Sequence, residues 1–328
     1  MLVKNYLKTK KLKSDSTRAG FGRGLVEAAQ KNKQIVALTA DLSESTKLLD
    51  FEQKFPERYF DVGVAEQNLA GVAAGLALSG KIPFMTSYAV FSPGRNWDQI
   101  RVSIAYNQAN VKIVSTHAGL NVGPDGATHQ GLEDIALMRV LPNMTVIVPA
   151  DAEQARQATI AISRLQGPVY LRLTRSNTPV FIDAKNNFKL GQAQVLQTGS
   201  DVTLIVCGPL VYQTLLAVEA LKRHHIAATV INCHTIKPLD VKTILASVKK
   251  TKAVVTVEEH QRAGGLGSAI AETLAVQYPV PQEFVAVDDT FGESGQADEL
   301  LQKYGLTVEH IITAAIKVIG RKEKSSKL

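Results

Sequence analysis

The chain has 328 residues, enough for two domains, and its 45% hydrophobic residues with a mean hydropathy of +0.01 are typical of a soluble globular protein. The net charge of +7 comes from the ends, because five lysines precede Ser14, residues after Gly320 add +3, and the body carries −1. This distribution argues against a nucleic-acid partner, and the lack of eighteen consecutive apolar residues argues against a membrane span.

Two cysteines, Cys207 and Cys233, offer no disulfide framework and fit a reducing compartment. Each ends an apolar run, which favours a small core residue over a metal ligand or nucleophile, although His234 follows Cys233. The Lys-rich N-terminus lacks the apolar segment of a secretory signal. The final Ser326-Lys327-Leu328 is a peroxisomal address only in a eukaryote, so we expect a cytoplasmic protein.

Short β-rich runs alternate with helical patterns over residues 14–185, which predicts an α/β domain with a parallel sheet between helices. The glycines at 20–24 do not have the spacing of a dinucleotide-binding motif. Asp151 is a predicted N-cap of the helix that follows it. The strands are expected at 35–38, 111–115, 144–148 and 169–173, and the helices after Glu66, at 97–106 and at 152–163.

Glu66 opens a helix of small residues, since Ala and Gly occupy seven of the fourteen positions from 65 to 78. Small side chains let another backbone approach closely, so we expect this helix to be buried, with Glu66 buried too or facing a cleft. A buried carboxylate needs a specific partner. The alternative is a carboxylate that only complements the helix dipole from the first turn.

The His117–Gln130 segment is a glycine-rich loop directly after the predicted strand 111–115. Loops at the carboxyl ends of strands form the ligand crevice of an open α/β sheet. His117, Asp125 and His129 supply groups for proton transfer and hydroxyl recognition, and histidine is well matched to neutral pH. A metal site is the alternative, but the spacing is irregular and no cysteine accompanies these residues. We therefore predict a functional loop.

The polar, turn-rich stretch 175–187 interrupts the pattern and is the expected linker. Residues 186–320 then predict a second doubly wound α/β domain of three to four strands, with 1–13 and 321–328 as basic flexible tails. The segment Gly264–Gly267 could offer N–H groups to an anion, but a tight strand-to-helix turn is the simpler explanation. The strands are expected at 202–207, 228–231, 253–257 and 284–287, and the helices at 211–223, 241–248 and 267–276.

Several ordered motifs resemble the transketolase family of thiamine diphosphate enzymes, over about residues 16 to 319. They are Asp61-Val-Gly-Val-Ala-Glu66-Gln-Asn68, Thr86-Ser-Tyr88-Ala-Val-Phe91, the loop 117–130, Leu141-Pro-Asn143, Pro149-Ala-Asp151, Leu173-Thr-Arg175, Val257-Glu-Glu259-His260 and Gly264-Gly-Leu-Gly267. The resemblance implies a thiamine diphosphate-binding (pyrimidine) fold over 14–185, followed by a transketolase C-terminal-domain-like fold over 186–320.

The family's early part, whose Gly-Asp-Gly and later Asn hold the diphosphate and its divalent metal, has no counterpart in this sequence. Pro124-Asp125-Gly126 has proline in place of the first glycine and falls within the histidine loop. The resemblance therefore implies a split enzyme. An N-terminal transketolase subunit would supply the site for Mg²⁺ or Ca²⁺ and the diphosphate, and this chain alone would be inactive and hold no metal.

Residue by residue, the resemblance implies that Glu66 bonds N1′ of the aminopyrimidine and favours the tautomer that forms the reactive ylide. Tyr88 and Phe91 would line that ring, with ordinary core packing as the alternative for each, and Asp41 would lie near the cofactor and dimer interface. The implied catalytic residues are Glu66, His117 and His129, and the implied substrate-binding residues are Arg18, Ser45, His117, Asp125, His129 and Arg175.

The implied reaction transfers a two-carbon ketol unit from a ketose phosphate to an aldose phosphate, in an α2β2 assembly. A 1-deoxy-D-xylulose-5-phosphate synthase-like half-enzyme is the alternative that Gln67 favours. Two further alternatives fit less well. The beta subunit of a 2-oxo acid dehydrogenase is also a two-domain half-enzyme, but its pattern lacks the loop from Gly123 to His129 that is present here. A non-catalytic regulatory subunit with the same fold would be expected to have lost Glu66, which is also present. Gly94 replaces a third aromatic residue of the family, so the pocket is looser or filled by Trp97.

Overall fold

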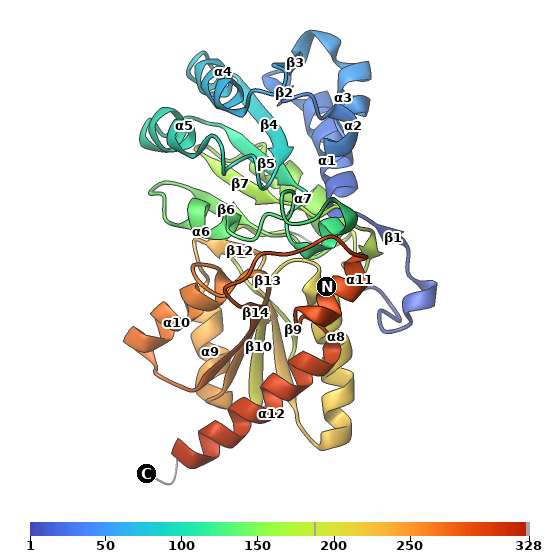
Figure 1. The fold of residues 1–328 in the computed structure, drawn as a ribbon, viewed down its shortest axis with the longest axis vertical. Coiled ribbons are helices and arrows are strands. Elements are labelled where there is room, and N and C mark those ends of the chain that lie inside the picture. Colours follow the sequence, from blue (N-terminus) through green and yellow to red (C-terminus); the bar gives the residue numbers. More distant parts are fainter. Residues whose placement is uncertain (187, 326–328) are drawn as a thin grey trace.

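Two α/β domains stand one above the other in the protein (Figure 1). The computed structural model describes residues 1–186 and 188–325. The upper domain is built on a seven-stranded sheet and the lower domain on a five-stranded sheet. The predicted pair of α/β domains is therefore confirmed.

The seven-stranded sheet has six parallel strands and one antiparallel edge strand. In order across the sheet they are β12 (Thr235–Lys237), β6 (Thr145–Ile147), β7 (Val169–Arg172), β5 (Lys112–Thr116), β4 (Ile82–Tyr88), β2 (Ile35–Thr39) and β3 (Tyr59–Asp61). Strands β2, β5 and β7 are buried over their whole length, as expected when helices cover both faces of a parallel sheet. Strands β3, β4 and β12 were not predicted, and β12 joins the second half of the chain to this sheet.

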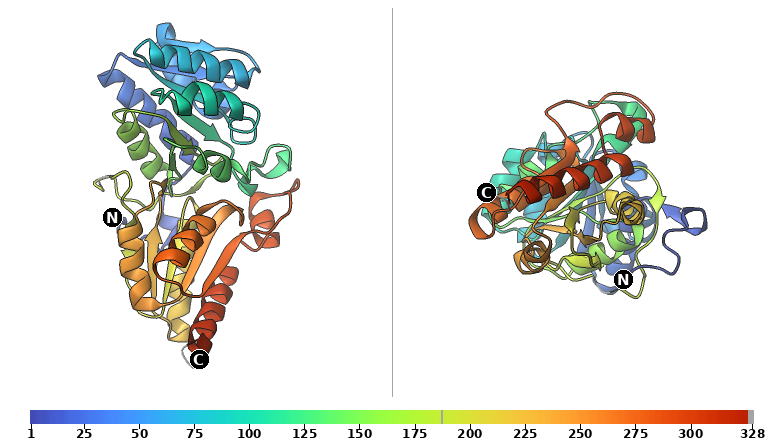
Figure 2. Two further views of the ribbon diagram at one scale, coloured as in Figure 1. Left: turned by 90° about the vertical axis from the view of Figure 1, so that its left-hand side faces the viewer. Right: turned by 90° about the horizontal axis from the view of Figure 1, so that it is seen from below.

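Helices α1 (Thr17–Lys31) and α7 (Ala152–Ile162) lie side by side on one face of this sheet (Figure 2). Their close approach depends on two glycines of α1. A Cβ at Gly24 would lie 2.7 Å from the carbonyl oxygen of Arg156, and one at Gly20 would collide with the carbonyl of Ala152. This contact explains the glycine cluster that lacked dinucleotide-binding spacing.

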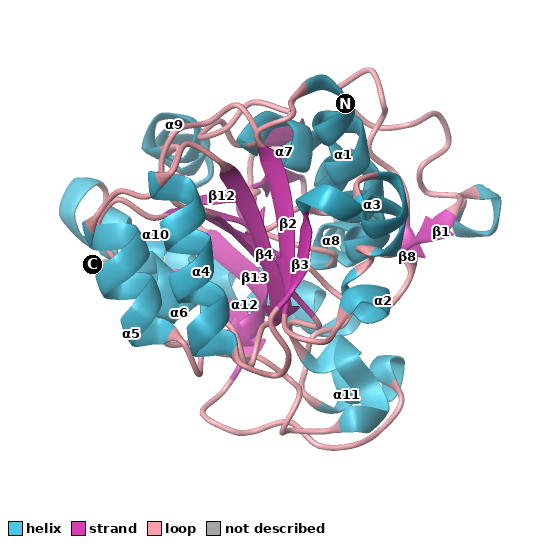
Figure 3. Cartoon of the chain, turned by 90° about the horizontal axis from the view of Figure 1, so that it is seen from above, coloured by secondary structure: helices cyan, strands magenta, loops and turns pink. Residues whose placement is uncertain are grey.

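The other face carries the small-residue helix and the helix predicted at 97–106 (Figure 3). Alternation along β2 sends Val36 and Leu38 to this face and Ile35 and Ala37 to the α1 face. The helices of this face are α4 (Glu66–Leu78), α5 (Trp97–Gln99), its π-helical continuation η3 (Ile100–Tyr106) and α6 (Asp134–Arg139).

Helix α4 is buried on one face only, which corrects the expectation of a buried helix. Leu69 and Ala73 pack into the core, whereas a Cβ at Gly71 or Gly75 would meet nothing within 4 Å. The glycines face open space because the core needs only one stripe of this helix. Glu66, at its first turn, is buried as expected.

Asp151 connects the start of α7 to the segment at the end of the first domain through hydrogen bonds to main-chain N–H groups. Its Oδ1 accepts a hydrogen bond from the N–H of Gln154 at 2.8 Å, which confirms the predicted N-cap. Its Oδ2 accepts from the N–H groups of Phe181 and Ile182 at 2.7 Å, and burial raises the pKa of the carboxyl to about 6.

The remaining short elements of this half are η1 (Thr9–Lys11), β1 (Ser14–Asp15), α2 (Ser43–Thr46), α3 (Leu49–Lys54), η2 (Pro56–Arg58), η4 (Leu120–Asp125) and β8 (Thr178–Pro179).

The second sheet has four parallel strands at the predicted places and an unpredicted antiparallel edge strand. In order they are β14 (Gln282–Val287), β13 (Val254–Gln261), β10 (Val202–Val206), β11 (Ala228–Asn232) and β9 (Gln194–Gln197). The helices are α8 (Leu210–Leu221), η5 (Lys222–His224), α9 (Val241–Thr251), α10 (Leu266–Gln277), α11 (Ala297–Lys303) and α12 (Val308–Ser325). Helices α8 and α12 pack on one face of the sheet, and α9 and α10 on the other.

Residues 1–13 and 321–325, which belong to the segments expected as flexible tails, contact the rest of the protein. Helix α12 continues to residue 325 along the lower domain (Figure 1). At the other end, the N–H of Val3 donates to the carbonyl of Phe181 at 2.9 Å, and the hydroxyls of Thr9 and Tyr212 are 2.7 Å apart. Charge suggested tails, but Tyr6 and Leu12, which lie between the N-terminal lysines, are partly buried and pack against the core of the second domain. The tripeptide 326–328 lies outside the described residues.

Cys207 and Cys233 are buried in the core that both domains share, as predicted. The segment Gly264–Gly267 is the tight turn into α10. Its N–H groups at Leu266 and Gly267 each donate to the buried carboxylate of Glu258 at 2.7 Å. Among the described residues, no helix is long and apolar enough to cross a membrane.

Candidate active site

The residues predicted for chemistry gather at the carboxyl edge of the seven-stranded sheet. Tyr88 is the last residue of β4, His117 directly follows β5, and Arg175 lies three residues after β7. Asp41 lies two residues after β2 at the same edge. Parallel strands end on one side, so residues distant in the sequence meet there.

Four rings form the centre of this edge. Tyr88 stacks on His117, with ring centroids 3.8 Å apart, and Phe91 lies 5.9 Å from Tyr88 in a stacked arrangement. Phe91 also meets His129 edge-on at 5.5 Å. The structure thus brings together both predicted aromatic residues and both predicted histidines, and their ring faces suit a flat heteroaromatic ligand.

Glu66 begins α4 beside these rings and is 1% exposed. Its Oε2 lies 2.7 Å from Nη1 of Arg95, which is half exposed. The guanidinium carbon of Arg95 lies 4.8 Å from the centroid of the Phe91 ring. A buried carboxylate needs such a partner, and a cation over a ring face adds attraction. Glu66 is therefore more than a helix-dipole partner.

Trp97 does not take the place of the missing third aromatic residue, contrary to one of our expectations. Its indole N–H donates to the carbonyl of Leu137 at 3.0 Å, and its ring packs against the core beneath α4. Arg95 lies against Phe91 instead. The sequence did not identify Arg95, because one arginine beside an aromatic segment has no distinguishing pattern.

His117 is held neutral. Burial, followed by the charges of Arg18 and Arg175, lowers its pKa to about 3. Its Nδ1 lies 2.8 Å from the hydroxyl of Thr116, and its Nε2 lies 3.4 Å from Nη1 of Arg18. A guanidinium only donates, so Nε2 accepts and Nδ1 carries the proton. His117 therefore presents a lone pair on Nε2.

Two arginines flank His117 at the sheet edge. Nη1 of Arg18 donates to the main-chain carbonyl of Ser45 at 2.7 Å, and Nη1 of Arg175 donates to that of Val122 at 2.6 Å. Burial, and then the charge of Arg175, lowers the pKa of Arg18. These guanidinium groups repel each other across the site, which makes the site attractive to an anion such as a phosphate.

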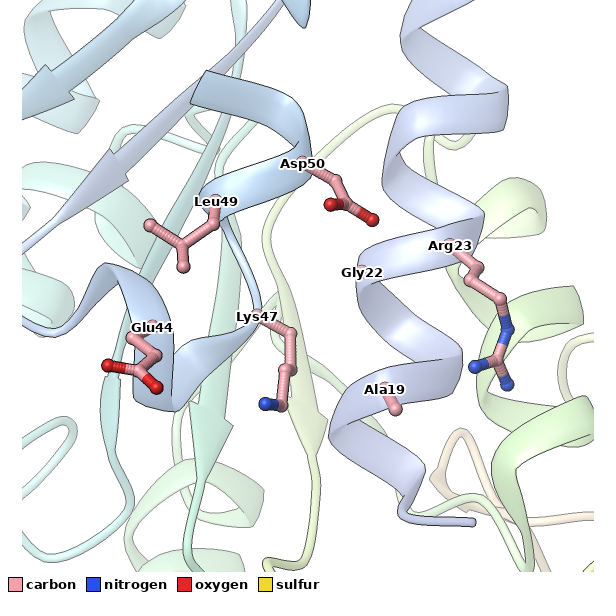
Figure 4. Close-up of a pocket in the computed structure, with 7 residues that line it drawn as sticks. All are labelled: Ala19, Gly22, Arg23, Glu44, Lys47, Leu49 and Asp50. Atoms are coloured by element: carbon pink, nitrogen blue, oxygen red, sulfur yellow. The ribbon is translucent and has the colours of Figure 1, made fainter. Parts of the chain in front are cut away.

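Lys47 adds a further positive charge that sequence reasoning missed. It lines a cavity of about 280 Å³ between α1 and the segment that joins α2 to α3 (Figure 4). Figure 4 shows its ammonium directed away from Asp50, and its charge helps to lower the pKa of His117. In the same wall, Arg23 pairs with Asp15 at 2.7 Å. A single lysine in a polar stretch gives no sequence signal.

Asp125 and His129 lie toward the open side of the loop. Oδ1 of Asp125 is 3.5 Å from Nη1 of Arg175, and both side chains are more than one-third exposed. Nδ1 of His129 lies 2.9 Å from the hydroxyl of Thr128. Both predicted residues are therefore open to a ligand that enters along the rings.

Asp41 and Ser45 meet the site through their main chains. The N–H of Asp41 donates to Oδ1 of Asp61 at 2.9 Å, and that oxygen also accepts from the N–H of Gly63 at 2.9 Å. These contacts fix the loop that leads to Glu66. Ser45 offers Arg18 its carbonyl. In residues 1–186 and 188–325, no group of three or more His, Cys, Asp or Glu side chains is placed to hold a metal ion.

A buried carboxylate and stacked rings at the strand ends of an open α/β sheet define the class of protein as a two-domain α/β protein with a candidate ligand site at that edge. Residues 13–180 match the family model of the transketolase pyrimidine binding domain, and residues 191–311 match that of the transketolase C-terminal domain. The chain belongs to the transketolase family and corresponds to its C-terminal half.

Relatives of similar extent cover nearly the whole chain. A transketolase C-terminal section from Methanocaldococcus jannaschii is 46% identical over 298 residues, which are 90% of this chain and 93% of that protein. A 6-deoxy-6-sulfo-D-fructose transketolase subunit from Clostridium sp. strain MSTE9 is 47% identical over 299 residues, which are 91% of this chain and 92% of that protein. The solved structure of a split gene transketolase, an inactive β4 tetramer, is similar with a TM-score of 0.88 and 48% sequence identity. The match covers 94% of this chain and 99% of that chain.

Proposed function

We propose that this chain is the C-terminal subunit of a split transketolase that moves a two-carbon ketol unit reversibly from a ketose phosphate to an aldose phosphate. The observation that carries the proposal is Glu66, a carboxylate with 1% exposure at the start of α4, next to stacked rings at the sheet edge. Its retention argues against a non-catalytic regulatory subunit. The similar extent of the split relatives supports the division into two subunits.

The site fits the aminopyrimidine of thiamine diphosphate. Tyr88 and Phe91 offer ring faces, and Glu66 offers a carboxylate that could bond the ring nitrogen in place of Arg95. When bound, this cofactor supplies the carbon nucleophile that breaks and re-forms the carbon–carbon bond of the sugar. We assign the diphosphate and its Mg²⁺ or Ca²⁺ to an N-terminal partner subunit, because the family's metal-binding motif belongs to that part.

The remaining side chains would bind the sugar. Neutral His117 can accept a hydrogen bond at Nε2 from a sugar hydroxyl in place of the long one from Arg18, while Asp125 and His129 would bind hydroxyls near the reacting carbons. Arg18 and Arg175 would bind the phosphate, for which the planar guanidinium is well shaped. Ser45 would assist through the carbonyl that holds Arg18.

The open face of α4 supports self-association. Gly71 and Gly75 leave space above the helix, and the neighbouring Val64, Leu78 and Tyr106 are 71%, 68% and 81% exposed. Apolar surface of this kind marks interaction sites, and it adjoins Glu66 at the helix start. We propose an α2β2 assembly with the cofactor between subunits.

We also propose a cytoplasmic location, because the two buried cysteines of this chain are free and fit a reducing compartment.

Reconstitution tests this function. This chain, a candidate N-terminal subunit, thiamine diphosphate and Mg²⁺ are mixed, and ketol transfer between a ketose phosphate and an aldose phosphate is measured. We expect transfer by the mixture and none by either subunit alone. Formation of 1-deoxy-D-xylulose 5-phosphate from pyruvate and glyceraldehyde 3-phosphate, without ketol transfer, would instead support the synthase-like alternative.

A further inference from the structure

A buried contact joins the second domain to the loop that carries the candidate substrate residues. Glu259, in β13, is 4% exposed. Its Oε1 accepts a hydrogen bond from the N–H of Asn121 at 2.7 Å. The side-chain Nδ2 of Asn121 lies 3.1 Å from Oε1 and 3.0 Å from Oε2. Asn121 belongs to η4, which leads directly to Asp125.

The other end of the Asn121 amide holds the segment after β7. Its Oδ1 accepts hydrogen bonds from the N–H groups of Arg175 at 3.2 Å and Ser176 at 3.3 Å. The hydroxyl of Ser176 donates to the carbonyl of Asn121 at 2.7 Å. Arg175 also donates from its side chain to the carbonyl of Val122. One amide therefore connects the loop to the position of Arg175.

Glu259 and the segment after β7 together fix which way this amide points. The carboxylate oxygens of Glu259 accept from Nδ2 of Asn121, while the main-chain N–H groups of Arg175 and Ser176 can only donate, so Oδ1 faces them. Burial raises the pKa of Glu259, and Asn121 offsets part of the cost of that burial with hydrogen bonds from its main-chain and side-chain N–H groups. The carboxylate fits closely because residue 119 is a glycine, where a Cβ would collide with it.

We propose that Glu259 is a positioning residue, which sets the orientation of Arg175 and of the loop bearing Asp125 through Asn121. It thereby gives the second domain a part in binding the phosphate end of the substrate. The assignment of the phosphate to Arg175 rests on the proposed function. The contact spans 138 positions of sequence and two domains.

The first test uses the isolated chain and does not depend on activity. In Glu259→Gln, one acceptor oxygen is replaced by an N–H₂ group, so the hydrogen bonds from the main-chain and side-chain N–H groups of Asn121 are weakened and the loop is held less firmly. We expect faster hydrogen–deuterium exchange at residues 119–126 and 174–177. Exchange equal to that of the unmodified chain would overturn the proposal.

The matched control is Glu258→Gln on the same strand. Glu258 is 1% exposed, and its carboxylate accepts from the N–H groups of Leu266 and Gly267 at the start of α10. We expect it to leave exchange at the loop unchanged. An equal increase in both variants would make the effect a general loss of stability and overturn the proposal. If Glu259→Gln does not fold, Glu259→Asp, which keeps the carboxylate but shortens its reach, is measured in the same way and should raise exchange at the loop above that of the unmodified chain, whereas unchanged exchange would overturn the proposal.

The second test uses the reconstituted enzyme. For a phosphate-bearing donor, Glu259→Gln should raise KM roughly tenfold, as loss of a hydrogen bond to a charged group would, and leave kcat within about twofold. For hydroxypyruvate, which has no phosphate to meet Arg175, KM should rise less. Unchanged KM for both donors, with an active unmodified mixture, overturns the positioning role alone. An inactive unmodified mixture overturns the proposed function, while the exchange experiment still decides the role of Glu259.

Discussion

The guanidinium of Arg95 lies 2.7 Å from the carboxylate of Glu66 and over the face of Phe91, so a half-exposed cation covers a carboxylate that is almost fully buried. A ring that bonds Glu66 must share or displace this ion pair. The guanidinium of Arg95 is half exposed, so it can return to solvent when a ligand donor takes over the hydrogen bond to Glu66. Arg95 can therefore stabilise Glu66 without blocking a ligand.

Removal of Arg95 should destabilise the isolated chain modestly. Arg95→Gln leaves the buried Glu66 without its cation, and we expect the free energy of unfolding to fall by about 1 kcal/mol in urea denaturation. Arg101→Gln, at an exposed arginine of η3, is the control and should have no effect. In the Glu66→Gln background, Arg95→Gln should also lose its effect. A loss of the same size in that background would show that the ion pair is not its cause.

His117 should remain neutral at physiological pH. Its pKa of about 3 in the folded protein lies below the value of about 6.5 in the unfolded chain. The unfolded chain therefore binds the proton first, and stability falls as the pH drops from 6.5 towards 3. Between pH 7 and pH 5 this residue should account for a loss of about 2 kcal/mol, which His117→Gln removes. Titration of the His117 ring near pH 6.5 in an NMR experiment would refute this.

Lys47 should contribute to binding the anionic end of the substrate. Lys47→Gln removes a charge that reaches His117, so we expect KM for a sugar phosphate to rise roughly threefold at low salt, with kcat unchanged. The difference should shrink as salt is added. Lys33→Gln, at an exposed lysine before β2, serves as the control. A salt-independent change in Lys47→Gln would argue for a structural role.

The open face of α4 should be an assembly surface. A side chain at Gly71 meets no atoms within 4 Å in this chain, so Gly71→Arg should leave the fold and its thermal stability intact. In sedimentation experiments, however, we expect loss of self-association, because the arginine would occupy the space left for a second copy. Ala246→Arg, at an exposed position of α9, is the matched control. Undiminished self-association of Gly71→Arg would rule out this face.

Local patterns were enough to predict the two α/β domains and the position of the histidine loop. His117 could be placed at the ligand edge because it follows a predicted strand. Tyr88 and most other site residues came from the family resemblance, since strand β4 was not predicted. Asp151 could be identified as an N-cap because its spacing to Gln154 is local. These features depend on residues that are neighbours in the sequence or on the shared direction of strands.

Long-range packing could not be predicted. Strand β12 joins the first sheet although it follows β11, and the contact of Glu259 with Asn121 crosses the two domains. The open glycines of α4 looked like core residues, because small side chains suit close packing wherever it occurs, within a chain or between chains. Periodicity reports which face is apolar, and it does not identify the element that covers that face.

We propose that Glu66 acts on the cofactor ring in a ketol-transfer site shared with a partner subunit. The most direct measurement compares kcat/KM for ketol transfer by the mixture of both subunits, thiamine diphosphate and Mg²⁺, with and without Glu66→Gln. We expect transfer by the unmodified mixture and a fall of roughly a hundredfold or more in the variant, with assembly retained. Equal rates, or transfer by this chain without a partner, would contradict the account.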